Sequence, residues 1–307
     1  MTRHLEGRVA IVTGGGRGIG LAIARRLAAC GASVLIVDNG ASIDGRSFEP
    51  GIAEAAAAAI GPSARALARD IASPEAAAEM VAMARDCLGG VDILVHAAAI
   101  LRDAMIWKLA PEDFDAVLRT NLASAQYLLH AATPLMREQA KAGRGDGRIL
   151  MLVSSAAFYG NVGVAAYAAA KAGLLALTRV AALELGRAGI TANAIMPFAA
   201  TRVTESLPPA NELLKSYRAH AMKVPPEPVG ILASWLAGAD AADISGQLVG
   251  IRGREVFLMT QPRPMERIHL SGAMDEKSLA EAARAAFSGA LTPLETDLEA
   301  FNYAPII

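Results

Sequence analysis

Cysteine is scarce in this sequence, whose 307 residues include only Cys30 and Cys87. Each lies late in a helical stretch and shortly before a glycine, so we expect two buried packing thiols and no disulfide. The five histidines show no metal-ligand spacing, and no metal site is predicted. A disulfide-stapled scaffold and a zinc-binding module are therefore not expected.

Charge of one sign is also lacking, because 29 Lys and Arg residues nearly balance 30 Asp and Glu residues and leave a formal net charge of -1. No basic run approaches the Lys/Arg clusters of nucleic-acid-binding proteins, so we expect no nucleic-acid partner. No apolar run reaches the length of a membrane span, and the first seven residues lack the apolar core of a signal peptide. We expect a cytoplasmic protein without a membrane partner.

Hydrophobic residues make up 53% of the chain and charged residues only 19%, which is enough to bury a large core. Strand-like and helix-like runs alternate without a break from Arg8 to Gly253. This pattern predicts an α/β fold with a single doubly wound parallel sheet of the Rossmann type over residues 1–253. Residues 254–307 form a C-terminal extension with a helical stretch at Asp275–Phe287, whose apolar face we expect to pack on the domain or in a subunit interface.

A phenol and a cation stand one helical turn apart at Tyr167 and Lys171. Residues i and i+4 share a helix face. A positive charge ~4 Å away at an effective dielectric of ~20 contributes about 4 kcal/mol, enough to bring a phenol pKa from about 10 to ~7. Such a pair also occurs on solvated helix faces. Ser154, however, follows the apolar run Ile149–Val153 and offers a hydroxyl that can hold an alcohol or carbonyl oxygen, so the three residues predict acid-base catalysis.

Near the amino terminus, the apolar run Val9–Thr13 leads into a glycine-rich turn and a helical stretch. Glycines allow a tight turn and close approach to a pyrophosphate, which the helix N-terminus attracts. A second apolar run ends at Asp38, about twenty residues further on. Its carboxylate can bind the adenosine ribose and would repel a 2′-phosphate, so NAD is predicted over NADP, although an acid on a solvated loop is the alternative interpretation. The predicted cofactor residues of the turn are Gly14, Arg17, Gly18, Ile19 and Gly20.

Several motifs occur in a familiar order: Thr13-Gly-x-x-x-Gly-Ile-Gly20, Asp70-Ile71, Asn121, Ser154 and Tyr167-x-x-x-Lys171. Over about residues 5–252 this set resembles the short-chain dehydrogenase/reductase family. The resemblance implies that Tyr167 is the general acid/base and that Lys171 lowers its pKa and binds the nicotinamide ribose. It also implies that Ser154 orients the substrate and that Asn121 completes a water-linked proton relay.

The resemblance further implies that Asp70 and Ile71 flank the adenine. The chain departs from the family at His96-Ala-Ala-Ala99, where Asn-Asn-Ala-Gly is usual, and at Pro197-Phe198, where Pro-Gly is usual. The backbone at His96, Ala97 and Pro197 can still meet the cofactor. We interpret His96 as a structural histidine beside the cofactor, because the other residues supply every proton-transfer role.

Residues 201–228 have the pattern of a lid over the substrate. Prolines at 208, 209, 225, 226 and 228 bracket a short helical piece with Leu213, Leu214 and Met222. These apolar side chains suit an acyl chain or a sterol, and the basic residues of the segment could meet coenzyme A phosphates. A solvated helix face explains the same basic residues equally well. The basic residues are Arg202, Lys215, Arg218, His220 and Lys223.

Four shorter segments resemble the hydroxyacyl-CoA dehydrogenase part of peroxisomal multifunctional enzyme type 2 and its bacterial relatives. They are Asp38-Asn-Gly, Ile100–Asp103, Phe158–Gly160 and Pro197–Thr204. The resemblance implies an NAD-dependent enzyme that interconverts a secondary alcohol and a ketone on a small molecule such as a 3-hydroxyacyl-CoA or hydroxysteroid, and a homodimer or homotetramer. Two alternatives remain: an NADPH-dependent 3-oxoacyl-(acyl carrier protein) reductase, and a catalytically idle dinucleotide-binding scaffold subunit.

Overall fold

The computed structural model describes residues 3–206, 211–269 and 274–307. The chain divides into two compact units. The first unit comprises residues up to Met259 together with Thr296–Ile307, and the second is Thr260–Glu295. We describe each unit by itself.

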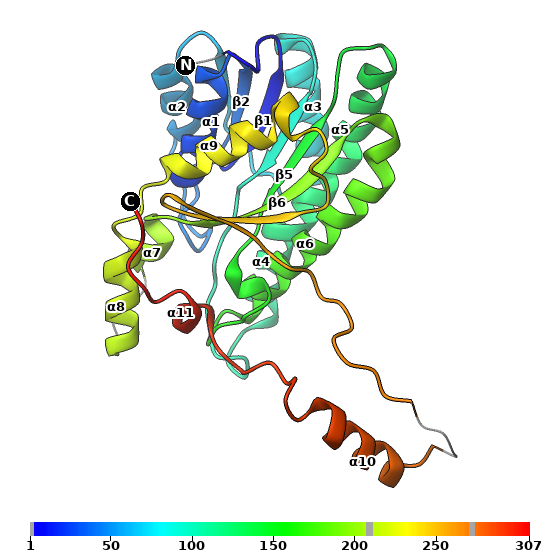
Figure 1. Cartoon of the computed structure of the whole chain (residues 1–307). Helices are drawn as coiled ribbons and strands as arrows, with labels where there is room; N and C mark the ends of the chain where they lie inside the picture. The colour runs from blue at the N-terminus through cyan, green and yellow to red at the C-terminus, as the bar shows by residue number, and fades with distance from the viewer. Residues whose placement is uncertain (1–2, 207–210, 270–273) are drawn as a thin grey trace. The chain divides into compact units, whose positions relative to one another are not determined.

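An eight-stranded sheet forms the centre of the first unit, in the order β3-β2-β1-β4-β5-β6-β7-β8 (Figure 1). The strands are β1 Val9–Thr13, β2 Ser33–Val37, β3 Ala64–Leu67, β4 Ile93–His96, β5 Arg148–Leu152, β6 Thr191–Phe198, β7 Leu248–Arg252 and β8 Glu255–Leu258. Strands β1 to β7 pair in parallel, which confirms the predicted doubly wound fold. The last strand differs from the prediction: β8 runs antiparallel to β7, because the hairpin at Gly253 is too short for a crossover.

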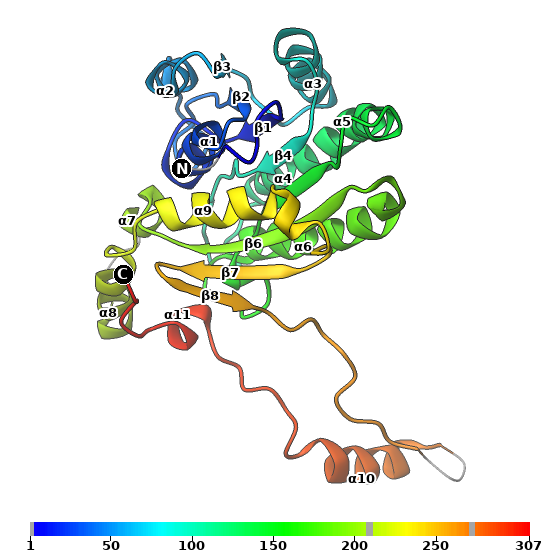
Figure 2. The same ribbon diagram turned by 45° about the horizontal axis from the view of Figure 1, so that its top comes forward.

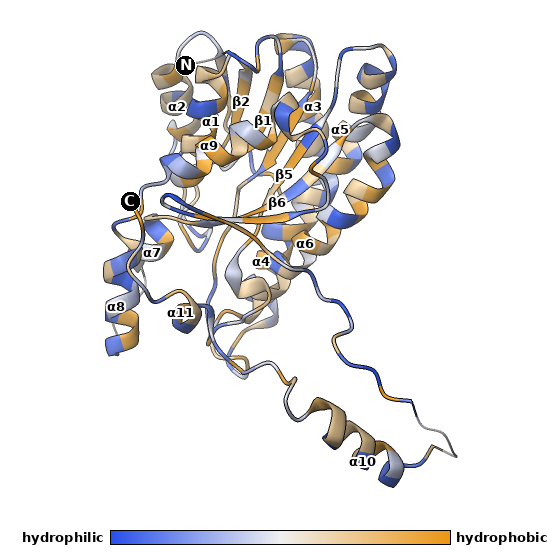
Figure 3. Cartoon of the chain, in the orientation of Figure 1, coloured by the Kyte–Doolittle hydropathy of each residue, from blue (hydrophilic) through white to orange (hydrophobic). Residues whose placement is uncertain are grey.

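Helices cover both faces of this sheet, α1, α2 and α9 on one and α3, α5 and α6 on the other (Figure 2). Their bounds are α1 Gly18–Ala29, α2 Ile52–Ile60, α3 Pro74–Leu88, α5 Ser124–Lys141, α6 Ala165–Leu185 and α9 Glu227–Leu236. Alternate residues of β1 supply the two cores, Ile11 to the α3 side and Ala10 and Val12 to the α1 side. The strands are therefore apolar along their length, as the colours of β1 and β5 in Figure 3 show.

Strand order reverses between β1 and β4, since β1 continues toward β2 and β3 on one side while β4 leads to β5 on the other. In sheets of this kind a crevice opens at the carboxyl ends of the strands where the order switches. Two short segments follow β4 near this crevice, helix α4 (Pro111–Leu118) and a π-helical turn, Arg119–Ala123. The fold thus positions the ends of β1, β2, β4 and β5 around one opening.

Helix α6 and the short 3₁₀ turn after it, Ala165–Ala188, are long and apolar enough to cross a membrane by length and composition alone. The expectation that no apolar run reaches this length was therefore wrong for α6. The helix packs in the larger of the two cores, beside β5 and β6, and a core helix passes the same test of length and composition. Only 33% of its apolar window is buried, and Val180 and Leu183 of the same helix are exposed, so this packing accounts for part of its apolar character.

The predicted lid contains two helices instead of one short piece, α7 (Arg202–Ser206) and α8 (Glu212–Ala221). Pro208 and Pro209 lie outside the described residues. Asn211 caps α8 by accepting a hydrogen bond from the N–H of Leu214 (2.8 Å). Within α8, Lys215 pairs with Glu212 (2.6 Å). That ion pair supports the alternative interpretation of Lys215 as part of a solvated helix face.

The C-terminal extension has two different parts. Helix α10, Glu276–Phe287, forms as predicted and begins with a capping box between Asp275 and Ser278. Among the described residues of the second unit, α10 has no buried residue. The last twelve residues, Thr296–Ile307, instead belong to the first unit and contain the short helix α11, Asp297–Ala300. The first unit therefore extends beyond residue 253, the predicted boundary, and also includes the last twelve residues of the chain.

The two cysteines are free thiols in different surroundings. Cys30 is fully buried at the end of α1, as expected. Cys87 is exposed, contrary to expectation, because it lies in the last turn of α3, beyond Ala84, the last buried residue of that helix.

Candidate active site

A cavity of about 520 Å³ opens at the carboxyl ends of the strands, where the strand order switches. It brings together most of the residues predicted for cofactor binding and catalysis. Those lining it are Gly14, Arg17, Gly18, Ile19, Gly20, Asp38, Asp70, Ile71, Ala97, Ser154, Tyr167, Lys171 and Pro197. His96 and Asn121 do not line it.

The glycine-rich turn between β1 and α1 is shaped by close main-chain packing. Gly14 has a positive φ of 64°, and a Cβ there would lie 2.7 Å from the backbone of Ala98. A Cβ at Gly20 would overlap the carbonyl oxygen of Gly14. No side chain caps the N-terminus of α1, so its first N–H groups and positive dipole end are available to an anion. The turn therefore fits a pyrophosphate.

Asp38 follows β2 and is braced by the turn. One carboxylate oxygen accepts a hydrogen bond from the N–H of Gly16 (3.0 Å) and the other from the N–H of Gly40 (2.8 Å). Each carboxylate oxygen can accept two hydrogen bonds, so both keep capacity for a ribose hydroxyl. Arg17 lies beside this position, where its guanidinium donates to Glu49 (3.0 Å) and to the carbonyl of Ala41 (2.8 Å).

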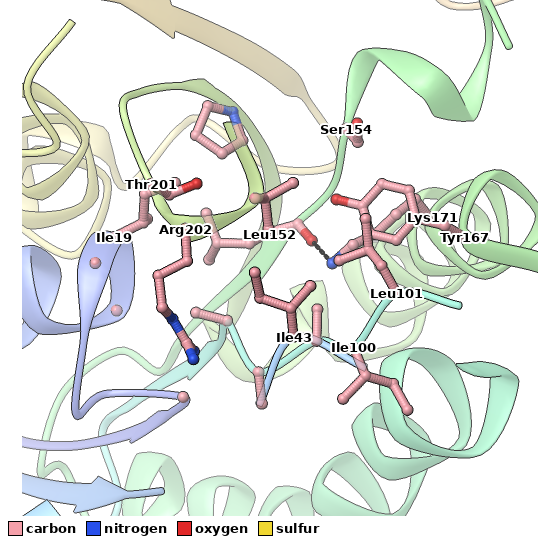
Figure 4. A pocket seen from close by; sticks show the side chains of 18 of the residues that line it. Ile19, Ile43, Ile100, Leu101, Leu152, Ser154, Tyr167, Lys171, Thr201 and Arg202 are labelled. Atoms are coloured by element: carbon pink, nitrogen blue, oxygen red, sulfur yellow. Dashed lines mark hydrogen bonds between the residues drawn. The ribbon is translucent and has the colours of Figure 1, made fainter. Parts of the chain in front are cut away.

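Tyr167, Lys171 and Ser154 converge on one side of the cavity (Figure 4). The ammonium of Lys171 lies 5.6 Å from the centre of the Tyr167 ring and donates a hydrogen bond to the carbonyl of Leu152 (2.6 Å). Ser154 follows β5, and its hydroxyl accepts a hydrogen bond from the N–H of Ala156 (3.3 Å), which begins a 3₁₀ turn. The end of β5 and the first turns of α6 thus hold the three side chains together.

The sequence predicts a lowered pKa for Tyr167, and this direction was wrong, because the surrounding protein residues raise it. Tyr167 is partly exposed toward the cavity, yet protein surrounds it closely enough that desolvation raises its pKa to about 12, against the opposing effect of the Ser154 hydroxyl. Lys171 is 2% exposed, and burial lowers its pKa to about 7. The prediction counted the attraction between the two groups and omitted the cost of removing both from water.

A family model described as enoyl-(acyl carrier protein) reductase matches residues 14–253. The chain is a member of the short-chain dehydrogenase/reductase family. It is 37% identical over 292 residues to the hydroxyacyl-CoA dehydrogenase ChsB1 of Mycobacterium tuberculosis, which covers 94% of this chain and 91% of that protein. A crystal structure of a short-chain dehydrogenase from Mycobacterium avium superposes with a TM-score of 0.81 at 33% identity, over 95% of this chain and 99% of that one.

Mouse peroxisomal multifunctional enzyme type 2 is 34% identical over 243 residues, which cover 79% of this chain but only 31% of that longer protein. These relatives establish the short-chain dehydrogenase as an oxidoreductase that interconverts CH–OH groups and ketones on small molecules. Membership of the family also implies a nicotinamide cofactor, NAD or NADP. The glycine turn and the braced carboxylate of Asp38 are residues that fit such a cofactor.

Asn121 lies in the π-helical turn of the dehydrogenase and is fully buried. Its side-chain amide donates to the carbonyl of Ile100 (2.9 Å), and its side-chain oxygen accepts from the N–H of Ile100 (2.8 Å). The side chain therefore braces the segment after β4. Its predicted role in a proton relay, which the main-chain carbonyl would have to fill, stays a prediction.

His96 is 1% exposed at the end of β4, and one ring nitrogen lies 3.1 Å from the hydroxyl of Thr13. The other ring nitrogen lies 3.4 Å from the carbonyl of Asn121 and 3.5 Å from the hydroxyl of Ser124. Burial, followed by the nearby charge of Lys171, lowers its pKa to about 3. The imidazole is thus neutral near pH 7 and links β1, β4 and the π-helical turn, which agrees with its interpretation as a structural residue.

Several cavity residues of the dehydrogenase were not singled out from the sequence as ligand contacts. Ile43 and Phe48 come from the loop after β2, which pairs with the segment after β4 through Leu101 N–H and the carbonyl of Ile43 (2.8 Å). Tyr217 comes from α8, and Asp297 with Leu298 comes from the end of the chain. The loop after β2, residues 39–51, is longer than a typical strand-to-helix connection, and this length is the one signal that the sequence gives for any of these residues.

The structure corrects which residues of the predicted lid line the cavity. Of the five basic residues named for coenzyme A, Arg202 is the one that lines the cavity within the described part of the chain. Leu213, Leu214 and Met222 do not line it. The lid side of the cavity is formed instead by Val203, Thr204, Tyr217, Ala221 and Val224.

The departure at Phe198 has a structural reason. Its ring is buried, with its centre 4.5 Å from that of Phe301 and 6.5 Å from that of Phe257. Phe301 also meets Tyr159 edge to face at 5.6 Å. In place of the glycine usual in the family, this dehydrogenase has an aromatic side chain against which the end of the chain packs.

Proposed function

We propose that this enzyme oxidises the secondary alcohol of a 3-hydroxyacyl-CoA, with a hydroxysteroid as a second substrate class, and uses NAD. The observation that carries the proposal is that one cavity holds Tyr167 and Ser154 at one end and Gly14 and Asp38 at the other. The similarity to a hydroxyacyl-CoA dehydrogenase over 94% of the chain supports the substrate class.

The chain's own residues supply the proton chemistry. In oxidation, the Tyr167 phenolate takes the proton of the substrate hydroxyl while Ser154 holds the same oxygen by a hydrogen bond. A nicotinamide cofactor held by the glycine turn and Asp38 would supply the hydride acceptor for the carbinol carbon. In the reverse direction the protonated phenol donates to the ketone oxygen. Because desolvation raises the Tyr167 pKa to about 12, this residue is a phenol near neutral pH, and oxidation requires that it first lose its proton. Burial also lowers the pKa of Lys171 to about 7, and only the charged form of this side chain, 5.6 Å from the centre of the Tyr167 ring, favours the phenolate.

Asp38 supports NAD over NADP. Its two carboxylate oxygens are already oriented by Gly16 and Gly40, and a 2′-phosphate beside them would meet like charge. Two guanidinium groups lie near this position: that of Arg17 is engaged with Glu49, and that of Arg202 donates to the carbonyl of Ala41 (3.3 Å). We expect the Asp38→Ala variant to lower the preference for NAD over NADP by about tenfold, the scale of one charge interaction of 1 to 2 kcal/mol. An unchanged preference would reject this role.

The substrate class is tested by initial rates of NADH formation with (3R)- and (3S)-3-hydroxyacyl-CoA, a hydroxysteroid and a simple secondary alcohol. The proposal expects the highest kcat/KM with one 3-hydroxyacyl-CoA enantiomer. A rate with the simple alcohol that equals the rate with every thioester would show that the acyl-CoA assignment is wrong. NADPH with the corresponding 3-oxoacyl thioesters serves as the comparison for the reductive cofactor.

A further inference from the structure

The last twelve residues, which we call the C-terminal strap (Thr296–Ile307), are fixed at the edge of the catalytic cavity. Phe301 and Leu298 are each 7% exposed. Asn302 accepts a hydrogen bond from the hydroxyl of Ser216 on α8 (3.0 Å), and the N–H of Arg254 donates to the carbonyl of Ile306 (2.8 Å). These contacts hold the strap at both ends, so a side chain near its beginning has a defined position.

Asp297, in the first turn of the strap, faces this cavity. The residue is 8% exposed, and one carboxylate oxygen accepts a hydrogen bond from the hydroxyl of Ser155 (2.8 Å). Its other oxygen is buried and has no hydrogen-bond partner among the described residues. Desolvation raises the pKa of this carboxyl, and the Ser155 hydroxyl opposes the rise, followed by the nearby backbone of Leu298 and the side chain of Asn161.

A buried carboxylate oxygen without a partner is costly and calls for an explanation. No Lys or Arg side chain forms an ion pair with Asp297 within the described residues. Arg252 also lines the cavity, but its guanidinium lies 3.5 Å from Glu255 and stacks over the ring of Tyr303. The protein therefore does not neutralise Asp297, which leaves the free oxygen for a ligand.

A second carboxylate acts on the same end of the cavity. Asp103, after β4, also lines the cavity, although its side chain remains accessible to solvent. Both Asp103 and Asp297 raise the pKa of Tyr167, so the negative field of both reaches the acid-base residue. A substrate carboxylate next to the reacting alcohol would meet like charge from both Asp103 and Asp297, whereas an ester or thioester would not.

We propose that Asp297 is a specificity-determining residue whose free oxygen accepts a hydrogen bond from a neutral substrate and whose charge, together with that of Asp103, excludes hydroxy acids that carry a free carboxylate. The inference rests on the alcohol oxidation proposed above and adds to it the charge class of the substrate. It concerns neutral acyl derivatives in general, of which thioesters are one kind.

Three substrates with the same 3-hydroxyl group test how a negative charge on the substrate affects its oxidation. They are 3-hydroxybutyrate, its methyl ester and its N-acetylcysteamine thioester. We expect the wild-type enzyme to prefer the methyl ester to the free acid. We expect Asp297→Asn to reduce that preference about tenfold or more, the scale that one like charge in a pocket produces at an effective dielectric of about 20. The gain should come from a higher kcat/KM with the free acid.

Asparagine retains an oxygen for the Ser155 hydroxyl, so the strap should stay in place. Glu299→Gln is the matched control, because it removes one charge from the same short helix at an exposed residue that does not line the cavity. Asp103→Asn tests the same exclusion from the opposite side and serves if the Asp297 variant does not fold. Asp297→Leu removes the acceptor and should weaken the thioester, whose amide N–H is a donor, more than the methyl ester.

The outcomes distinguish the two proposals. Wild-type enzyme that turns over neither ester nor thioester overturns the proposed function and this inference with it. Enzyme that oxidises the esters but keeps the same ratio of ester to acid in Asp297→Asn and Asp103→Asn overturns this inference alone. A ratio that falls equally in Glu299→Gln would also overturn it, since the effect would then come from net charge.

Discussion

The two ends of the catalytic cavity are built in different ways. At the cofactor end, the glycine turn, Asp38 and Ala97 directly follow β1, β2 and β4, so main-chain geometry sets their positions. At the substrate end, Tyr217 and Asp297 come from segments far apart in the chain, α8 and the strap, which are joined by the hydrogen bond between Ser216 and Asn302. The cofactor end is thus encoded locally, and the substrate end depends on long-range contacts.

This difference indicates where one family can keep a reaction and change its substrate. The sheet and the first βα turn are needed for any nicotinamide cofactor. The aromatic contact of Phe198 with Phe301 instead joins β6 to the strap that carries Asp297. Substitutions at the substrate end should therefore change specificity while cofactor binding is preserved.

The largest expected effect comes from the boundary between the two ends. Tyr167→Phe removes the only hydroxyl that can move the substrate proton in the proposed mechanism, and kcat should fall by about 10³-fold. Binding of NADH, followed by its fluorescence, should change little, because the cofactor end is built from other elements. A Phe variant that keeps more than a tenth of the wild-type kcat would contradict the role of Tyr167, and a loss of NADH binding would contradict the independence of the two ends.

Local patterns explain why much of the molecule could be predicted from the sequence. The alternating elements predicted the sheet, the glycine spacing predicted the turn, and the i, i+4 spacing placed Lys171 beside Tyr167. The direction of the Tyr167 pKa could not be predicted this way, because desolvation depends on everything packed around the phenol. Pair spacing along a helix carries no information about such burial.

The substrate end could not be predicted, because no periodicity in a sequence pairs residues that are so far apart. Phe198 stood out as a departure from the family, but nothing in the sequence linked it to Phe301. Likewise, nothing in the sequence divided the extension, whereas in the structure Thr260–Glu295 form a separate unit and the strap belongs to the first unit. The expectation that the apolar face of α10 packs on the domain or in a subunit interface stays a prediction. Asp297 and Leu298 of the strap line the cavity.

A second prediction concerns a variant that weakens the contacts of the strap and leaves the residues of the cofactor end unchanged. Phe301→Ala removes a 7% exposed ring that meets Phe198 and Tyr159, a change that typically costs about 3 kcal/mol. We expect the strap to detach, which should increase the rate of hydrogen exchange over residues 296–307 and raise KM for the substrate. The dissociation constant of NADH should stay within about twofold, since a change of 0.4 kcal/mol or less corresponds to that range.

The matched control for Phe301→Ala is Leu294→Ala, which shortens an apolar side chain that is fully exposed. It should change neither exchange nor KM. If Phe301→Ala left the exchange of residues 296–307 unchanged, the aromatic contacts would not be what holds the strap. If it weakened NADH binding as strongly as substrate binding, the two ends of the cavity would be coupled.

The smallest effect is expected at the cofactor end, where His96 replaces the asparagine usual in the family. Its folded pKa is about 3, and its ordinary value is 6.5, so between these values the unfolded chain binds the proton more strongly than the folded one. Stability from this residue is therefore complete above about pH 6.5 and is lost as the pH falls toward 3. Between pH 7 and pH 5 the loss should be about 2 kcal/mol.

Urea unfolding at the two pH values should show that loss in the free energy of unfolding of the wild type and a smaller loss in His96→Asn. The exposed His130→Asn variant should keep the wild-type slope, and an equal slope in all three proteins would mean that the imidazole is not buried in its neutral form.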